Sequence, residues 1–176
     1  MSGAAKRKLM IVITVLVAFL LQYSVLSRWT LLAITPNLLL GLTCIYGLMY
    51  GQNHGMLSGL LAGLLIDAFA GDIIGFYGLI YCVIGYLTGH FHSMFFPEDH
   101  KLPIIGLCIS DFAYGVLIYF LYYFIRGDFH FFYYVLNIIM PELVITVLLM
   151  IPVYFFLLFL EEKISIGEQR REHTIV

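Results

Sequence analysis

Long runs of apolar residues, separated by short polar links, make up most of this chain. The runs cover about residues 9–27, 36–50, 55–70, 73–89, 102–125 and 131–160. A membrane-spanning helix needs about 20 predominantly apolar residues, and the second and third runs are short by that measure. The first run is longer than the apolar core of a signal peptide, so we interpret it as an uncleaved helix. The pattern predicts an all-α membrane protein, a bundle of six transmembrane helices within a single domain, 1–176.

The sixth run is longer than a membrane crossing requires. As a helix, residues 131–160 would extend about 45 Å at 1.5 Å per residue, whereas the hydrocarbon core is about 30 Å thick. Pro141 and Pro152 lie inside this run and interrupt regular helical hydrogen bonding. We therefore expect a kinked or tilted helix with one interfacial end, and a charged tail that extends it into the cytoplasm.

Composition identifies lipid as the solvent of this chain. Hydrophobic residues make up 62% and charged residues 11%, against roughly 45–50% and 25% in soluble domains. A net charge of −2 without a basic stripe excludes a nucleic-acid-binding protein. The three cysteines all lie in apolar runs and are too scattered for a disulfide framework or a zinc site.

Lysine and arginine positions set the orientation of the six helices. With the amino terminus in the cytoplasm, only Arg28 and Arg126 of the nine cations fall outside. The cytoplasmic cations are Lys6, Arg7, Lys8, Lys101, Lys163, Arg170 and Arg171. This asymmetry agrees with the positive-inside rule and disfavours five helices, which would move three cations outward. We expect both termini to be cytoplasmic.

Glycines repeat at helical spacing in the third run. Gly55, Gly59 and Gly63 lie four residues apart, so they share one face of a helix. Small residues let helices approach closely in lipid, where no hydrophobic effect drives their association. Together with Gly75 and Gly78, they predict a tight hairpin of residues 55–70 and 73–89. The same face is alternatively a docking surface for a partner's helix or for a second copy.

Four carboxylates lie in or next to the apolar runs, which contain no lysine or arginine. Charged side chains inside a bilayer are costly and need partners. We place Asp67 in the outer third, where Arg28 is the nearest cation, and Asp72 in the outer link. Asp111 and Glu142 both fall near mid-depth, where they could share a hydrogen-bonded site. They are either a polar clamp or partner contact, which we favour, or part of a proton or cation pathway.

The sequence contains no recognisable catalytic constellation. No serine, cysteine or threonine lies in a nucleophile motif with a base, and phosphate-binding and metal-ligand motifs are absent. We therefore expect no enzymatic activity, no cofactor and no metal. An intramembrane enzyme would gain support if Asp111 or Glu142 proved essential while assembly survived their replacement.

The middle of the chain carries a set of motifs that together resemble a known family. The motifs are Pro36-Asn37-Leu38-Leu39-Leu40, Gly47-x3-Gly51, Gly55-x3-Gly59-x3-Gly63-Leu64-Leu65-x-Asp67, Gly71, Gly75-Phe76-Tyr77-Gly78-x2-Tyr81 and Gly85-Tyr86-x2-Gly89. This pattern resembles the rod shape-determining protein MreD family, whose members often carry Asp where this chain has Asn37.

The resemblance implies a function without chemistry of its own. It implies a non-enzymatic scaffold of the bacterial elongation complex, which supports lateral peptidoglycan synthesis and cell shape from the cytoplasmic membrane. The implied partners are MreC, RodA and a class B penicillin-binding protein, with MreB filaments contacted indirectly. Membrane lipid and a second copy of the chain are further expected partners. The implied fold is similar to the substrate-binding subunits of vitamin transporters.

That fold suggests an alternative function, as a substrate-binding subunit for a small, vitamin-like molecule. Such a subunit needs an outward pocket with several convergent polar side chains. It also needs a patch of small residues on the first helix for its energising partner. The run 9–27 contains a single alanine, Ala18, which counts against this alternative.

Overall fold

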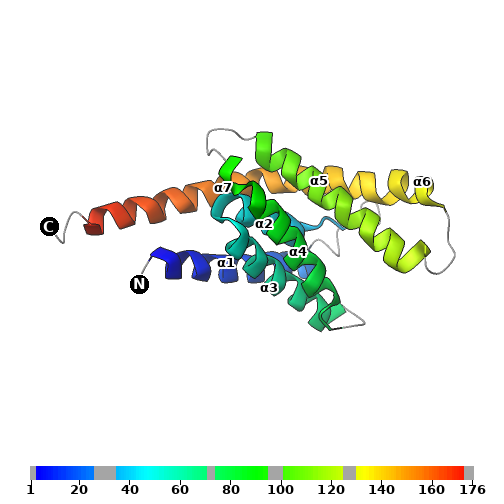
Figure 1. Cartoon of the computed structure of the whole chain (residues 1–176), viewed down its shortest axis with the longest axis horizontal. Coiled ribbons are helices and arrows are strands. Elements are labelled where there is room, and N and C mark those ends of the chain that lie inside the picture. The colour runs from blue at the N-terminus through cyan, green and yellow to red at the C-terminus, as the bar shows by residue number, and fades with distance from the viewer. Residues whose placement is uncertain (1–2, 26–34, 71–73, 95–100, 125–129, 173–176) are drawn as a thin grey trace.

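The chain is helical throughout the part that the structure describes. The computed structural model describes residues 3–25, 35–70, 74–94, 101–124 and 130–172, and no strand occurs in these ranges. The α-helices are α1 (Gly3–Leu20), α2 (Leu38–Tyr50), α3 (Gln52–Ala70), α4 (Phe76–His90), α5 (Lys101–Ile118), α6 (Phe131–Tyr134) and α7 (Met140–Glu172) (Figure 1).

Short turns of other helix types extend or join these α-helices. A π-helical turn, Leu21–Val25, follows α1, and another, Tyr119–Phe124, follows α5. A 3₁₀ turn, Phe91–Met94, ends α4, and the π-helical turn Val135–Ile139 joins α6 to α7. The described residues therefore form six continuous helical segments, in the order that the apolar pattern predicted.

The largest differences from the predicted boundaries lie at the two ends of the chain. The first helix begins at Gly3 rather than at residue 9, because alanine and lysine favour helix without being part of an apolar run. The last helix continues to Glu172, which confirms the predicted extension of the charged tail. The apolar part of the whole last helical segment, Phe131–Lys163, begins in α6 and has 33 residues, and so a length of about 50 Å, more than one bilayer core.

The two prolines of the last segment have different effects. The helix passes through Pro152 without a change of type. Pro141 is the second residue of α7 and lies two residues beyond the π-helical turn Val135–Ile139. Because Pro141 has no N–H, the carbonyl of Asn137, within this turn, loses its regular helical partner.

Helix α2 forms the centre of the bundle. Every residue from Leu38 to Met49 is buried, and α2 contacts α1, α3, α4, α5 and α7. Its sequence is apolar on all sides, as expected for a helix that other helices surround. The short second run is therefore a core helix.

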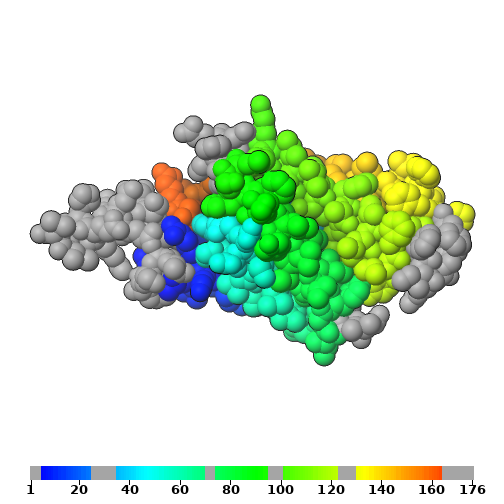
Figure 2. All heavy atoms as spheres, viewed as in Figure 1, coloured from blue at the N-terminus to red at the C-terminus, as the bar shows by residue number. Residues whose placement is uncertain are grey.

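The molecule has a partly polar interior and an apolar exterior. Exposed leucine, isoleucine, valine and phenylalanine side chains occur on every long helix, and Figure 2 shows one face, formed largely by α3, α4 and α5. The buried polar residues are Asn37, Thr43, Ser58, Asp67, Thr88, Ser110, Asp111 and Thr146. Water would oppose this arrangement, whereas lipid favours apolar side chains outside and hydrogen-bonded groups inside.

Within the described ranges, two segments meet the length and hydropathy expected of a membrane-crossing helix. They are Lys101–Tyr122 and Phe131–Lys163, with mean hydropathy 2.0 and 2.8 over their apolar windows. Only 22% of each window is buried. Core helices of soluble proteins are mostly buried, so the exposed apolar surface of these two segments indicates contact with lipid.

Candidate functional site

Helices α3 and α4 lie side by side and touch through their backbones (Figure 1). A Cβ atom at Gly55, Gly59 or Gly63 would lie closer than 3.0 Å to a main-chain carbonyl oxygen of α4. The three oxygens belong to Gly85, Tyr81 and Tyr77, respectively. This register is antiparallel, and no side chain fits at the three positions. We call the α3–α4 contact the glycine seam.

Helix α2 forms the third wall of the glycine seam. A Cβ atom at Gly55 would lie 2.8 Å from the Gly47 Cα, and the Thr43 methyl group would be 3.0 Å from a Cβ atom at either Gly59 or Gly85. The glycine face of α3 is thus occupied by other helices of the same chain. In this arrangement the face packs the hairpin, and it presents no open surface to another protein.

Asp67 lies at the end of the glycine seam and binds the first turn of α4. Its Oδ2 atom accepts hydrogen bonds from the N–H groups of Gly75, at 3.0 Å, and Gly78, at 2.9 Å. Its Oδ1 atom accepts one from the N–H of Tyr77, at 2.9 Å. The side chain is only 3% exposed. A buried carboxylate is therefore stabilised by three backbone donors and by the positive end of the helix dipole.

Two glycines make this capping arrangement possible. Gly75, the N-cap residue, has φ +95° and no side chain to cap α4, so Asp67 supplies the acceptor that Ser, Thr or Asn commonly provides there. A Cβ atom at Gly78 would lie 3.2 Å from Asp67 Oδ2 and 3.3 Å from the Leu64 Cδ2. The absence of a side chain at Gly78 lets the carboxylate approach the backbone.

The structure gives Asp67 a different partner from the one expected from sequence. Arg28, the cation expected nearest to Asp67, lies outside the described residues, as does Asp72. The observed contacts are backbone N–H groups, which stabilise a negative charge without a cation. A sequence signal existed: the helix after residue 75 begins with glycine and so needs an acceptor from elsewhere in the chain.

Asp111 and Glu142 are not joined by a hydrogen bond. Asp111, on α5, is 3% exposed, and its Oδ1 atom has no hydrogen-bond partner among the described residues. Glu142, in the first turn of α7, lines a small polar cavity that Asp111 does not reach. The two carboxyl groups nevertheless interact electrostatically, so a site shared by Asp111 and Glu142 stays a prediction.

The polar cavity beside Glu142 has a volume of about 170 Å³. Its lining residues are Gln22, Tyr23, Thr35, Asn37, Ile66, Tyr77, Tyr81, Tyr114 and Glu142. Asn37, which is the N-cap of α2, accepts hydrogen bonds from Leu40 N–H at 3.2 Å and from the Tyr81 hydroxyl at 2.7 Å. Its own N–H donates to Thr146 Oγ1 at 3.0 Å. Asn37 thus connects three helices, α2, α4 and α7.

An ion pair connects the first helix to the last. Arg7 Nη2 lies 3.0 Å from Glu161 Oε1, and the Tyr50 hydroxyl donates to Glu161 Oε2 at 2.6 Å. We call these three residues the terminal latch. The sequence marked Arg7 only as an orientation signal and Glu161 only as part of a charged tail, because contacts between distant segments leave no local pattern.

The fold and these contacts define a class of protein. An all-helical chain with apolar exterior helices and a buried polar interior is an integral membrane protein, here organised around a glycine-packed hairpin with an internal acidic cap. The family model described as rod shape-determining protein MreD matches residues 4–163. The chain therefore belongs to the MreD family, which takes part in rod-shape determination. Comparison with curated proteins gave no match, and neither did comparison with solved structures.

Proposed function

We propose that this chain is a non-enzymatic scaffold subunit of the complex that inserts lateral peptidoglycan in rod-shaped bacteria. The family match over residues 4–163 carries this proposal. The geometry supports it, because the buried polar groups with described partners hold helices together. Asp67 joins α3 to α4, and Asn37 joins α2 to α4 and α7.

The proposed topology has six membrane crossings with both termini in the cytoplasm of the bacterial cell. The terminal latch supports it, since Arg7 and Glu161 can pair only when α1 begins and α7 leaves the membrane on the same side. Figure 1 shows the two chain ends at one end of the molecule. The distribution of lysine and arginine then makes that side cytoplasmic.

The proposed partners are MreC, RodA and a class B penicillin-binding protein, with MreB filaments contacted indirectly. The links between helices are short, so contacts with these partners lie within the membrane or at its surfaces. A partner must then provide the domain that works outside the cytoplasmic membrane. Exposed apolar faces such as that of Leu79, Val83 and Leu87 on α4 are available for helix–helix contact in lipid.

Complementation combined with co-purification tests this proposal. The tagged full chain should restore rod shape in a rod-shaped bacterium depleted of its own MreD protein, and it should co-purify with MreC. Gly59→Leu should lower both the restoration of rod shape and the amount of co-purified MreC, because the leucine side chain would meet the α4 backbone. Met56→Leu, on the exposed side of the same helix, is the matched control and should behave as wild type.

Two results would contradict the proposal or its structural basis. The scaffold function fails if the wild-type chain neither restores shape nor brings MreC with it. The role of the glycine seam fails if Gly59→Leu keeps normal yield, MreC binding and rod shape.

A substrate-binding subunit for a vitamin-like molecule is the second candidate, and the polar cavity favours it. Its lining combines tyrosine, asparagine, glutamine and glutamate side chains. Its volume of about 170 Å³, however, lies below the roughly 300–1,000 Å³ of typical small-molecule sites. Denaturation of the purified protein followed by mass spectrometry tests this candidate, because a stoichiometric vitamin-like ligand would support it over the scaffold.

A further inference from the structure

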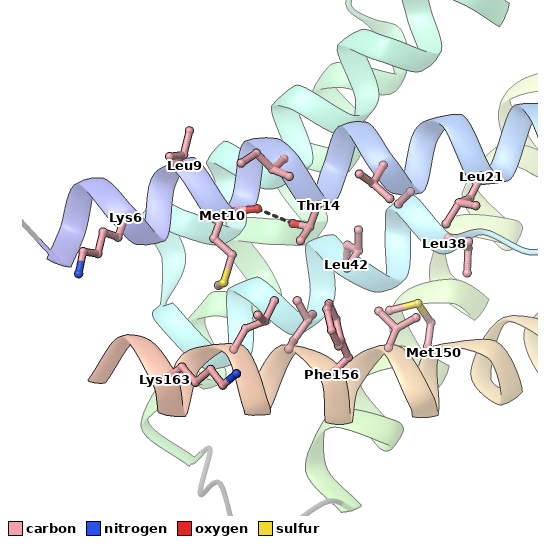
Figure 3. Close-up of a pocket in the computed structure, with 16 residues that line it drawn as sticks. Lys6, Leu9, Met10, Thr14, Leu21, Leu38, Leu42, Met150, Phe156 and Lys163 are labelled. Carbon is pink, nitrogen blue, oxygen red and sulfur yellow. Dashed lines mark hydrogen bonds between the residues drawn. The ribbon is translucent and has the colours of Figure 1, made fainter. Parts of the chain in front are cut away.

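A long apolar groove runs between α1 and α7, with α2 as its floor (Figure 3). Its volume is about 810 Å³. On the α1 side it is lined by side chains such as Leu9, Ile13 and Val17, and on the α7 side by Val153 and Phe156. Apart from two lysines and Thr14, whose hydroxyl bonds to the Met10 carbonyl, the lining is apolar. The groove is therefore a hydrocarbon-lined channel that is open at its side.

The length of this groove suits an acyl chain. It follows α1 from Lys6 to Leu21, which is about 22 Å at 1.5 Å per residue. The groove is therefore longer than one leaflet of the hydrocarbon core, about 15 Å.

Two cations lie at one end of the groove. Figure 3 shows Lys6 on α1 and Lys163 on α7 at the same end, with Leu21 and Leu38 at the other. The neighbouring Arg7 is already paired with Glu161. The Lys163 ammonium lies 4.4 Å from the centre of the Phe159 ring. Among the described residues neither lysine forms an ion pair, so both positive charges are available to an anion.

We propose that this groove binds an anionic phospholipid, with the phosphate near Lys6 and Lys163 and an acyl chain along the apolar walls. Basic pockets between transmembrane helices are known to suit acidic lipid headgroups. Here the charged end and the apolar length of the groove match the two parts of such a lipid. The bound lipid fills space that α1 and α7 leave open.

Charge argues against a protein occupant. In the proposed topology this end of the groove is cytoplasmic, where membrane helices are enriched in lysine and arginine, so a partner's helix would bring positive charge next to Lys6 and Lys163. A second copy of this chain in the same orientation would bring its own Lys6 and Lys163 to the same depth. Like charges at such a contact repel each other, whereas a phosphate is attracted.

Native mass spectrometry of the full chain in mild detergent tests the proposal. Added phosphatidylglycerol should remain bound to the wild type, and phosphatidylcholine with the same acyl chains should not. The double variant Lys6→Gln/Lys163→Gln should bind phosphatidylglycerol about 25-fold more weakly, at roughly 5-fold per lysine. Lys8→Gln/Lys101→Gln removes two charges that do not line the groove, and it should bind as wild type.

A second pair of variants tests the apolar part of the groove. Val17→Trp would fill the channel while leaving both lysines in place, and it should also lose phosphatidylglycerol. Leu16→Trp points away from the groove and should retain it. The proposal is overturned if the wild type binds both lipids equally, or if either control variant loses binding as strongly as its test variant. Cross-linking of a Val17→Cys variant to a protein chain, instead of to lipid, would also overturn it.

Discussion

Two aspartates show how the surroundings of a residue determine its role. Asp67 and Asp111 are both 3% exposed. Asp67 accepts three backbone hydrogen bonds, whereas Asp111 has a carboxylate oxygen without a partner among the described residues. Removing an acceptor that buried donors need costs about 1–3 kcal/mol, while removing an unpartnered group costs little. The same substitution should therefore have different effects at the two positions.

Asp67→Asn should lower the free energy of unfolding by about 2 kcal/mol or more. An amide has one acceptor oxygen in place of two, and its NH₂ group would face the N–H donors of α4. Asp111→Asn should destabilise the protein less than Asp67→Asn, because its Oδ1 atom has no hydrogen bond to lose among the described residues. Equilibrium unfolding in detergent, followed by circular dichroism, measures both variants against wild type. Equal destabilisation of the two variants would contradict the capping role of Asp67.

At the scale of elements, the glycine seam determines how closely α3 and α4 approach. The spacing of Gly55, Gly59 and Gly63 predicted one small-residue face and a hairpin, since spacing alone defines a face. The spacing could not predict the register against Tyr77, Tyr81 and Gly85, because that register depends on contacts across two helices. It also did not predict that α2 would close the third side of the seam.

A glycine-to-alanine substitution, which adds one methyl group, should change the stability of the protein differently at a seam glycine and at another helical glycine. Gly59→Ala should destabilise the protein by about 2 kcal/mol, because its Cβ would meet the backbone of α4 and force the helices apart. Gly106→Ala should be neutral or slightly stabilising. Its Cβ would meet the flexible end of Leu48 at 3.1 Å and the Cys44 Sγ at an ordinary contact distance of 3.7 Å, and alanine gains about 1 kcal/mol of helix propensity. Thermal unfolding measures the stability of the two variants against wild type. If Gly59→Ala leaves the stability unchanged, the seam tolerates a wider separation of α3 and α4.

At the scale of the whole molecule, the ends of the six helices were predictable and the spaces between them were not. Apolar runs and their polar links set where helices begin and end, apart from the extensions at Gly3 and Glu172. The groove between α1 and α7 and the polar cavity arise where packing is incomplete. Such spaces depend on side chains from several helices, so no local pattern of residues marks them in advance.

The proposed topology predicts that both chain ends lie on the cytoplasmic side. Reporter fusions after residue 176 and before residue 1 should both be active if the reporter works only in the cytoplasm. The ion pair of Arg7 with Glu161 requires at least that the two ends share one side. A carboxy-terminal reporter that is active only outside the cytoplasm would contradict the topology and the pairing together. A fusion in the link near residue 127 is the control and should show the outer location.

The terminal latch has a consequence for the order in which the protein assembles. Arg7 and Glu161 are 154 residues apart in the chain. Ribosomes add about 5–20 residues per second, so roughly 8–30 seconds separate the synthesis of these two residues. During that interval the first helix is already in place, while the carboxylate that will bind Arg7 has not yet been made. The first helix to be translated thus completes its contacts only after the last one emerges.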